Sequence, residues 1–248
     1  KTNSYDGWNV AQWEQYIREL ALFGTNTIEL IPPRSDDASD SPHFPAPQMD
    51  TMIAMSRIAD QYGLDVWIWY PALDPDYSDD KWVQFALKEW AEVFAKLPRI
   101  DAILVPGGDP GHTQPKYLFG LLEKQAASLE KTHPKAQWWV APQGFNNEWL
   151  DEFYGLARAN PAWLHGIVHG PQLRMTVGEL RRIIPARYPI RNYPDITHSL
   201  RCQFPVPEWD TAYALTLNRE PINPRPVDMK KIFDESAAST VGFITYSE

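Results

Sequence analysis

Short apolar runs alternate along this chain with segments whose apolar residues repeat at helical spacing. Nearly continuous apolarity over a few residues is typical of strands in a parallel sheet, because neither face of such a sheet meets water. Gly, Pro, Asn or Asp follows most of the runs, and these residues favour loops. Seven runs are present, at residues 26–32, 64–71, 101–106, 137–142, 164–170, 188–194 and 240–246. The sequence therefore predicts seven buried strands connected by helices.

The segments between the runs carry the signals that begin and end helices. Asn9 is a predicted N-cap for a helix that stops at Gly24. Thr176 and Glu179 have the spacing of a capping box at the start of another helix. The last helix is expected from about residue 227 to residue 238. A further helix is predicted to bury an apolar face formed by Trp82, Phe85, Ala86 and Val93.

Repeated strand–helix units with short connections predict the α/β class with a parallel sheet. A doubly wound sheet usually has a glycine-rich nucleotide loop after its first strand, and this sequence shows none. We therefore expect a (β/α)8 TIM barrel, with residues 1–248 forming a single catalytic-type domain. The chain opens on a helix after a polar stretch that resembles a loop leaving a strand. We expect the first barrel strand to lie upstream, in a longer protein whose remaining domains are partners of this one.

Composition excludes several kinds of partner and site. The 248 residues include 23 Lys plus Arg and 32 Asp plus Glu, which gives a formal net charge of −9. With a pI near 5.2, neither nucleic acid nor an anionic membrane is an expected partner. The single Cys excludes a disulfide scaffold and a multi-cysteine zinc site. No stretch approaches the roughly 20 apolar residues of a membrane span.

In a TIM barrel, chemistry takes place at the carboxyl ends of the strands, so position along the chain indicates candidate residues. The predicted catalytic residues are Asp109, Glu248 and Asp195. The predicted substrate-binding residues follow the other runs or lie in a long proline-rich loop. They are Arg34, Asp74, His112, Gln143, Asn146, His169, His198, Trp209 and Tyr246.

Asp109 is the central candidate because Gly107 and Gly108 let the backbone turn tightly after the third run. The turn would present one carboxylate at the mouth of the barrel. Hydrolysis of a glycosidic bond needs two carboxyl groups, or one acid and a group that polarises the acetamido group of the substrate. Asp109 suits either role, and the alternative is that it caps the following helix. Trp209 is the best candidate for an aromatic ring that stacks on a sugar, whereas most other Trp residues are expected in the core.

Gly107-Gly108-Asp109 resembles the Gly-Gly-Asp-Glu motif of family 20 β-hexosaminidases. The resemblance implies that Asp109 holds an acetamido group. The general acid of that family falls on Pro110, so a second carboxylate has to come from elsewhere, with Glu248 and Asp195 ranked above Asp74. The pattern of the whole chain, including residues 8–33, is also similar to that of the catalytic barrels of α-glucuronidases and α-N-acetylglucosaminidases.

The leading hypothesis is a glycoside hydrolase that acts on a neutral or N-acetylated sugar without a cofactor or metal. Such a role would favour a periplasmic or secreted location, although the sequence leaves the compartment open. One alternative is a metal-dependent sugar isomerase or epimerase, with ligands drawn from Asp109, His112, His169, Asp195 and Glu248. Another is a barrel that binds carbohydrate without catalysis, as Pro110 in place of the acid suggests.

Overall fold

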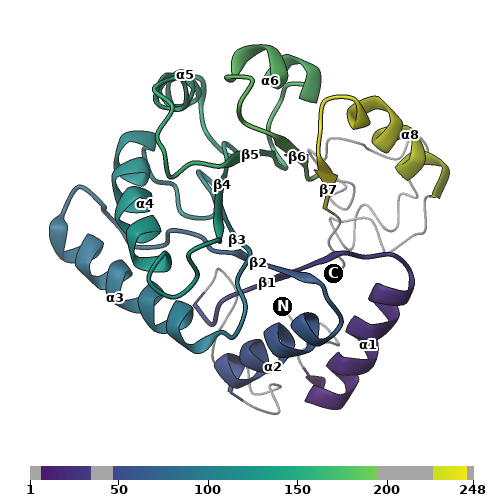
Figure 1. The fold of residues 1–248 in the computed structure, drawn as a ribbon. Helices are drawn as coiled ribbons and strands as arrows, with labels where there is room; N and C mark the ends of the chain where they lie inside the picture. The colour runs from purple at the N-terminus through teal and green to yellow at the C-terminus, as the bar shows by residue number, and fades with distance from the viewer. Residues whose placement is uncertain (1–6, 35–46, 195–225, 245–248) are drawn as a thin grey trace, which may run out of the picture. The chain divides into compact units, whose positions relative to one another are not determined.

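The computed structural model describes residues 7–34, 47–194 and 226–244. Helices and strands alternate along the chain (Figure 1). The described helices are α1 (Val10–Leu22), α2 (Gln48–Gln61), α3 (Asp80–Lys96), α4 (Pro115–Leu129), α5 (Asn147–Arg158), α6 (Val177–Ile183) and α8 (Pro226–Ala237). The described strands are β1 (Thr27–Leu30), β2 (Asp65–Trp69), β3 (Ala102–Pro106), β4 (Gln137–Ala141), β5 (Gly166–His169), β6 (Ile190–Asn192) and β7 (Gly242–Phe243). Each strand lies within a run predicted from the sequence.

The described strands belong to one seven-stranded sheet in the order β1-β2-β3-β4-β5-β6-β7. By contacts the chain divides into two compact units, residues 1–139 and 140–248. In the first unit, β1 pairs in parallel with β2, and β2 with β3. In the second unit, β5 pairs in parallel with β6, and β6 with β7. The predicted α/β fold with a parallel sheet is confirmed.

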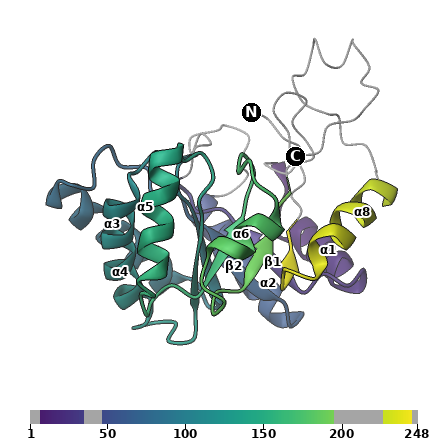
Figure 2. The same cartoon turned by 90° about the horizontal axis from the view of Figure 1, so that it is seen from above.

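The core of the first unit lies between its strands and its outer helices. Figure 1 shows α2, α3 and α4 on the outer side of the strands, and Figure 2 shows α3 and α4 side by side. Trp90 of α3 is 1% exposed, and its ring stacks on Tyr70 with the centroids 3.8 Å apart. Trp138 of β4 lies parallel to Trp90 at 6.2 Å. Large aromatic rings thus anchor the helix layer to the strands.

In the second unit, aromatic and arginine side chains fix the segment between α6 and β6. Phe153 of α5 and Tyr188 are fully buried. Arg181 of α6 donates hydrogen bonds to the backbone carbonyls of Tyr188 at 2.6 Å, Ile184 at 3.1 Å and Pro185 at 2.6 Å. These bonds connect α6 to the segment that leads to β6, from the C-cap residue Ile184 onward.

Both predicted helix caps are present. Asn9 accepts a hydrogen bond from the backbone of Gln12, and Thr176 forms the full capping box with Glu179. The predicted inner face of α3 was partly wrong, since Phe85 is 48% exposed. The residues of α3 that face the core are Val83, Ala86, Trp90, Val93 and Phe94.

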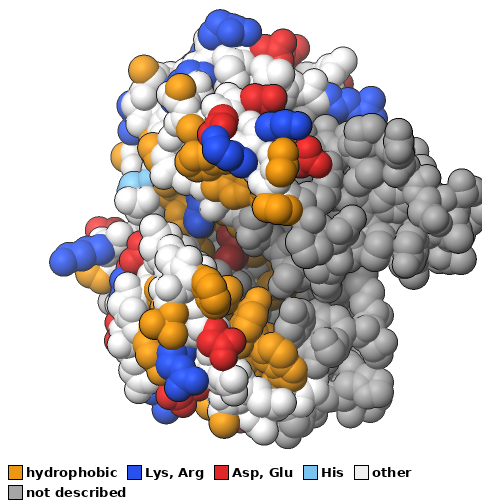
Figure 3. Space-filling model, turned by 90° about the vertical axis from the view of Figure 1, so that its right-hand side faces the viewer, with side chains coloured by type: hydrophobic (Ala, Val, Ile, Leu, Met, Phe, Trp, Pro, Cys, Tyr) orange, Lys and Arg blue, Asp and Glu red, His pale blue; other side chains and the backbone are white. Residues whose placement is uncertain are grey.

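Hydrophobic side chains also reach the surface of both units, and Figure 3 shows such side chains among the charged ones on one face. In the first unit Phe23 is 90% exposed, and in the second Val241 is 70% exposed. Exposed apolar residues are ordinary on protein surfaces, so we assign these no role. Of the helices described, none has the length and apolarity needed to cross a membrane.

Candidate functional site

Three segments of the first unit meet at the carboxyl ends of its strands. Arg34 follows β1, Asp74 follows β2, and residues 107–112 follow β3. The carboxyl ends of parallel strands lie at the same edge of a sheet. Because β1 pairs with β2 and β2 with β3, each of these segments follows a strand that neighbours the next one in the sheet. The sequence predicted Arg34, Asp74, Asp109 and His112 at this edge.

Arg34 and Asp74 are brought together in an ion pair. The Nη2 group of Arg34 donates to Oδ1 of Asp74 at 2.7 Å. The hydroxyl of Tyr77 donates to Oδ2 of the same carboxylate at 3.0 Å and accepts the backbone N–H of Asp74 at 2.9 Å. Because the Asp74 side chain is only 1% exposed and both of its oxygens are engaged, Asp74 holds Arg34 in place.

Glu89 of α3 is a second carboxylate on Arg34, and the sequence reasoning missed it. Its Oε1 atom accepts from Nε of Arg34 at 2.7 Å, and its Oε2 atom is buried without a hydrogen-bond partner among the described residues. Burial raises the pKa of Glu89, although Arg34 acts in the opposite direction. Partial burial disfavours the charged form of Arg34, but Glu89 and Asp74 outweigh it and raise its pKa. No local sequence pattern connects residues that are 55 positions apart.

The loop after β3 makes a close approach to the loop after β2. Gly107 and Gly108 are buried, whereas Asp109 is exposed. Gly111 has a φ of +114°, and a Cβ atom there would lie 2.6 Å from the carbonyl oxygen of Ala72. Only glycine fits this contact, which places the Asp109 loop directly against the segment that leads to Asp74. His112 is exposed at the end of the loop, with a φ of 50°.

The second unit places three predicted residues near its strand ends. Gln143 follows β4 and is 6% exposed, and a Cβ atom at Gly170 after β5 would lie 2.6 Å from its Oε1. Asn146 is the N-cap of α5, and its side chain accepts the backbone N–H of Trp149 at 2.9 Å. The side-chain oxygen of Asn146 is therefore used to cap α5.

His169 ends β5 and is 5% exposed. Its Nε2 atom lies 2.7 Å from the backbone carbonyl of Met175, and its Nδ1 atom lies 3.2 Å from Oδ1 of Asn192. Burial lowers the pKa of His169, although both hydrogen bonds favour the charged ring. The imidazole is thus committed to the loop before α6 and to the end of β6, and a ligand would have to displace one of these partners.

The remaining predicted residues lie outside the described part of the chain. These are the predicted catalytic residues Asp195 and Glu248 and the predicted binding residues His198, Trp209 and Tyr246. Among the described residues, no group of three or more His, Cys, Asp or Glu side chains is arranged to hold a metal ion.

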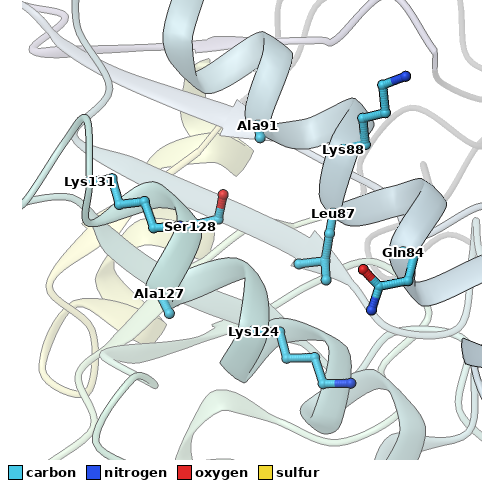
Figure 4. Close-up of a pocket in the computed structure, with 8 residues that line it drawn as sticks. All are labelled: Gln84, Leu87, Lys88, Ala91, Lys124, Ala127, Ser128 and Lys131. Carbon is cyan, nitrogen blue, oxygen red and sulfur yellow. The ribbon is translucent and has the colours of Figure 1, made fainter.

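A groove of about 410 Å³ lies between α3 and α4, away from the strand ends. Its lining includes Lys88, Lys124 and Lys131, with Leu87 and Ser128 between them. Figure 4 shows that the three lysine side chains extend in different directions rather than toward one another. The three lysine charges of the groove are therefore not arranged to bind one ligand together.

Comparison with known proteins supports the fold and leaves the family open. No protein-family model and no curated protein matches the sequence. A glycoside hydrolase family 5 protein from Bacteroides vulgatus has a similar structure, with a TM-score of 0.56 and 11% identity over 96% of this chain and 55% of that one. The chain thus spans about half the length of that protein.

Two further structures show the same likeness. An endo-1,4-beta-mannanase from Eisenia fetida matches with a TM-score of 0.54 and 12% identity, over 98% of this chain and 79% of that one. A sugar phosphate isomerase/epimerase from Parabacteroides distasonis matches with a TM-score of 0.58 and 12% identity, over 96% and 84% of the two chains. At such identities the likeness concerns the fold, and barrels of one fold host many chemistries. The fold is a partial TIM barrel of seven parallel strands, similar to those of glycoside hydrolases.

Proposed function

We propose that this protein is a glycoside hydrolase that acts on a neutral or N-acetylated sugar at the carboxyl ends of its strands. The observation that carries the proposal is the exposed Asp109 carboxylate, which a glycine turn presents at the end of β3. The loop that bears it is held against the segment leading to Asp74, which fixes the guanidinium of Arg34. A carboxylate presented on a loop at the strand ends is suited to bind and polarise a sugar.

In this proposal Asp109 orients the acetamido group or acts as one of the two carboxyl groups. Asp195 or Glu248 would supply the second carboxyl group. Arg34 and His112 would contact hydroxyl groups of the sugar. The binding roles expected for Gln143, Asn146, His169, His198, Trp209 and Tyr246 stay predictions. A separation of about 5 Å between the two carboxyl groups would favour a retaining mechanism, and about 6.5–9.5 Å an inverting one.

The test is the Asp109→Asn variant of the full-length protein, assayed with a panel of aryl glycosides that includes N-acetylglucosaminides. We expect kcat/KM to fall by roughly 100-fold or more, because an amide cannot supply the charge of the carboxylate. Asp151→Asn is the matched control, since Asp151 is exposed on α5, and it should retain activity. Full activity of Asp109→Asn on a substrate that the parent cleaves would reject this role.

The isomerase or epimerase hypothesis is the second candidate, and the similarity to the Parabacteroides distasonis protein favours it. It requires a stoichiometric divalent ion in the purified protein, which elemental analysis would detect. A binding barrel without catalysis would instead retain sugars that it does not turn over.

A further inference from the structure

Two carboxylates of the described residues hold the guanidinium of Arg34 in place. Asp74 accepts from Nη2 and Glu89 from Nε, each at 2.7 Å, and the carbon of the guanidinium lies 5.3 Å from the ring centre of Phe85. Among the described residues, no hydrogen bond uses the Nη1 group of Arg34. The side chain remains 38% exposed. The Nη1 group is therefore a preorganised donor at the strand ends.

Among the described residues, Arg34 and the two carboxylates that pair with it carry a net negative charge. An isolated guanidinium prefers a carboxylate, because its N–H groups match the two oxygens. Here one cation lies between two carboxylates that already occupy part of it. Lys81, in the first turn of α3, pairs with Asp79 at 3.3 Å and lies over the ring of Trp82. A ligand carboxylate at Nη1 would meet the repulsion of both Asp74 and Glu89.

We propose that Arg34 donates to the hydroxyl groups of an uncharged sugar and that Asp74 and Glu89 make this position reject sugar carboxylates. The selectivity comes from a repulsive element built into the site, as is common in specific recognition. Glu89 is a positioning residue, since its accepting oxygen orients Arg34 while its charge acts on the ligand.

This inference rests on the proposed carbohydrate function and gives a physical reason why acidic sugars would be excluded from it. The sequence resembles both hexosaminidases, which act on uncharged sugars, and α-glucuronidases, which act on acidic ones. The Arg34 site favours the uncharged class, because a uronate would place a third carboxylate beside a single guanidinium.

The test is an NMR titration of the full chain labelled with ¹⁵N, following the Nε–H signal of Arg34, which the Arg34→Lys variant identifies. The probes are N-acetylglucosamine and glucuronate. We expect the Kd for glucuronate to exceed that for N-acetylglucosamine by roughly fivefold or more. The reason is that the carboxylates of Asp74 and Glu89 would repel the glucuronate carboxylate from a few ångströms away in a half-exposed site. Raising the ionic strength should reduce this ratio by screening, a measurement that needs no variant.

Glu89→Gln keeps an oxygen that can accept from Arg34 but removes one charge. The ratio of the two Kd values should fall by about threefold. Glu123→Gln removes the same charge from the exposed surface of α4 and should leave the ratio unchanged. If Glu89 only supported the structure, Glu89→Gln would weaken the binding of both sugars equally.

Equal Kd values for the two sugars in the parent protein, or an unchanged ratio in Glu89→Gln, would overturn the inference. A chain that binds neither sugar at Arg34 would overturn it as well. Failure of the proposed function is distinguished by the hydrolysis assay, because these titrations measure binding without turnover. A protein that discriminates at Arg34 but hydrolyses no glycoside would contradict the hydrolase and support the sugar site.

Discussion

At the scale of single residues, Gly111 gives the sharpest stability prediction. Its φ is +114°, and an added Cβ atom would lie only 2.6 Å from the carbonyl oxygen of Ala72, so any side chain is costly there. We expect Gly111→Ala to lower the free energy of unfolding by about 2–4 kcal/mol, measured by urea denaturation. Gly120→Ala is the control, since Gly120 lies within α4 with no atom within 4 Å of the added methyl group. That change should raise stability by about 0.5–1 kcal/mol.

His169 gives a prediction about pH. Because burial lowers its pKa in the folded state, the unfolded chain takes up the proton first as the pH falls. The stability associated with the neutral ring is therefore complete above about pH 6.5, the ordinary His value, and is lost below it. The difference in unfolding free energy between the parent and His169→Gln should fall by at most about 1.4 kcal/mol per pH unit in that range. A difference that does not change with pH would contradict the buried neutral ring.

The sequence identified some residues of the site and could not identify others. The rule that strand ends carry function placed Arg34 and Asp74 at the same edge, and the structure pairs them at 2.7 Å. Glu89 lies within α3 rather than at a strand end, and nothing local marks it as a partner of Arg34. Likewise, the sequence placed His169 at a strand end but gave no sign that Met175 and Asn192 would occupy both ring nitrogens.

At the scale of elements, the strands were predicted well because a buried parallel strand is apolar throughout its length. β3 shows this clearly, since every residue from Ala102 to Pro106 is buried. The face of α3 was harder to predict, because aromatic residues occur on two of its sides. Trp82 and Phe85 lie in an edge-to-face pair 6.1 Å apart, with Phe85 beside Arg34, while Trp90 enters the core. Spacing gives a helix, but tertiary contacts decide which apolar side is buried.

The capping box of α6 supplies the prediction at this scale. Thr176 accepts the backbone N–H of Glu179 at 3.2 Å, and the Glu179 carboxylate accepts the backbone N–H of Thr176 at 2.7 Å. Thr176→Ala should lower the unfolding free energy by about 1 kcal/mol, because an N–H of the first turn loses its acceptor. Thr176→Ser keeps the hydroxyl and should cost only a few tenths of that. Equal losses in the two variants would mean that the methyl group of Thr176, rather than the cap, stabilises the helix.

At the scale of the whole molecule, the fold is compatible with both hydrolases and isomerases, so a measurement of metal dependence has to separate them. The isomerase hypothesis includes His169 among its ligands. Metal binding there would require the ring to release the Met175 carbonyl or Asn192, which lie 2.7 and 3.2 Å from its nitrogens. A hydrolase that uses carboxyl groups has no such requirement. We therefore expect dialysis against a chelator to leave glycoside hydrolysis within about twofold of its starting rate, given the carboxylate mechanism. Loss of activity that a divalent ion restores would instead favour metal-assisted chemistry, with Asp109 and His112 as the first residues to test as ligands.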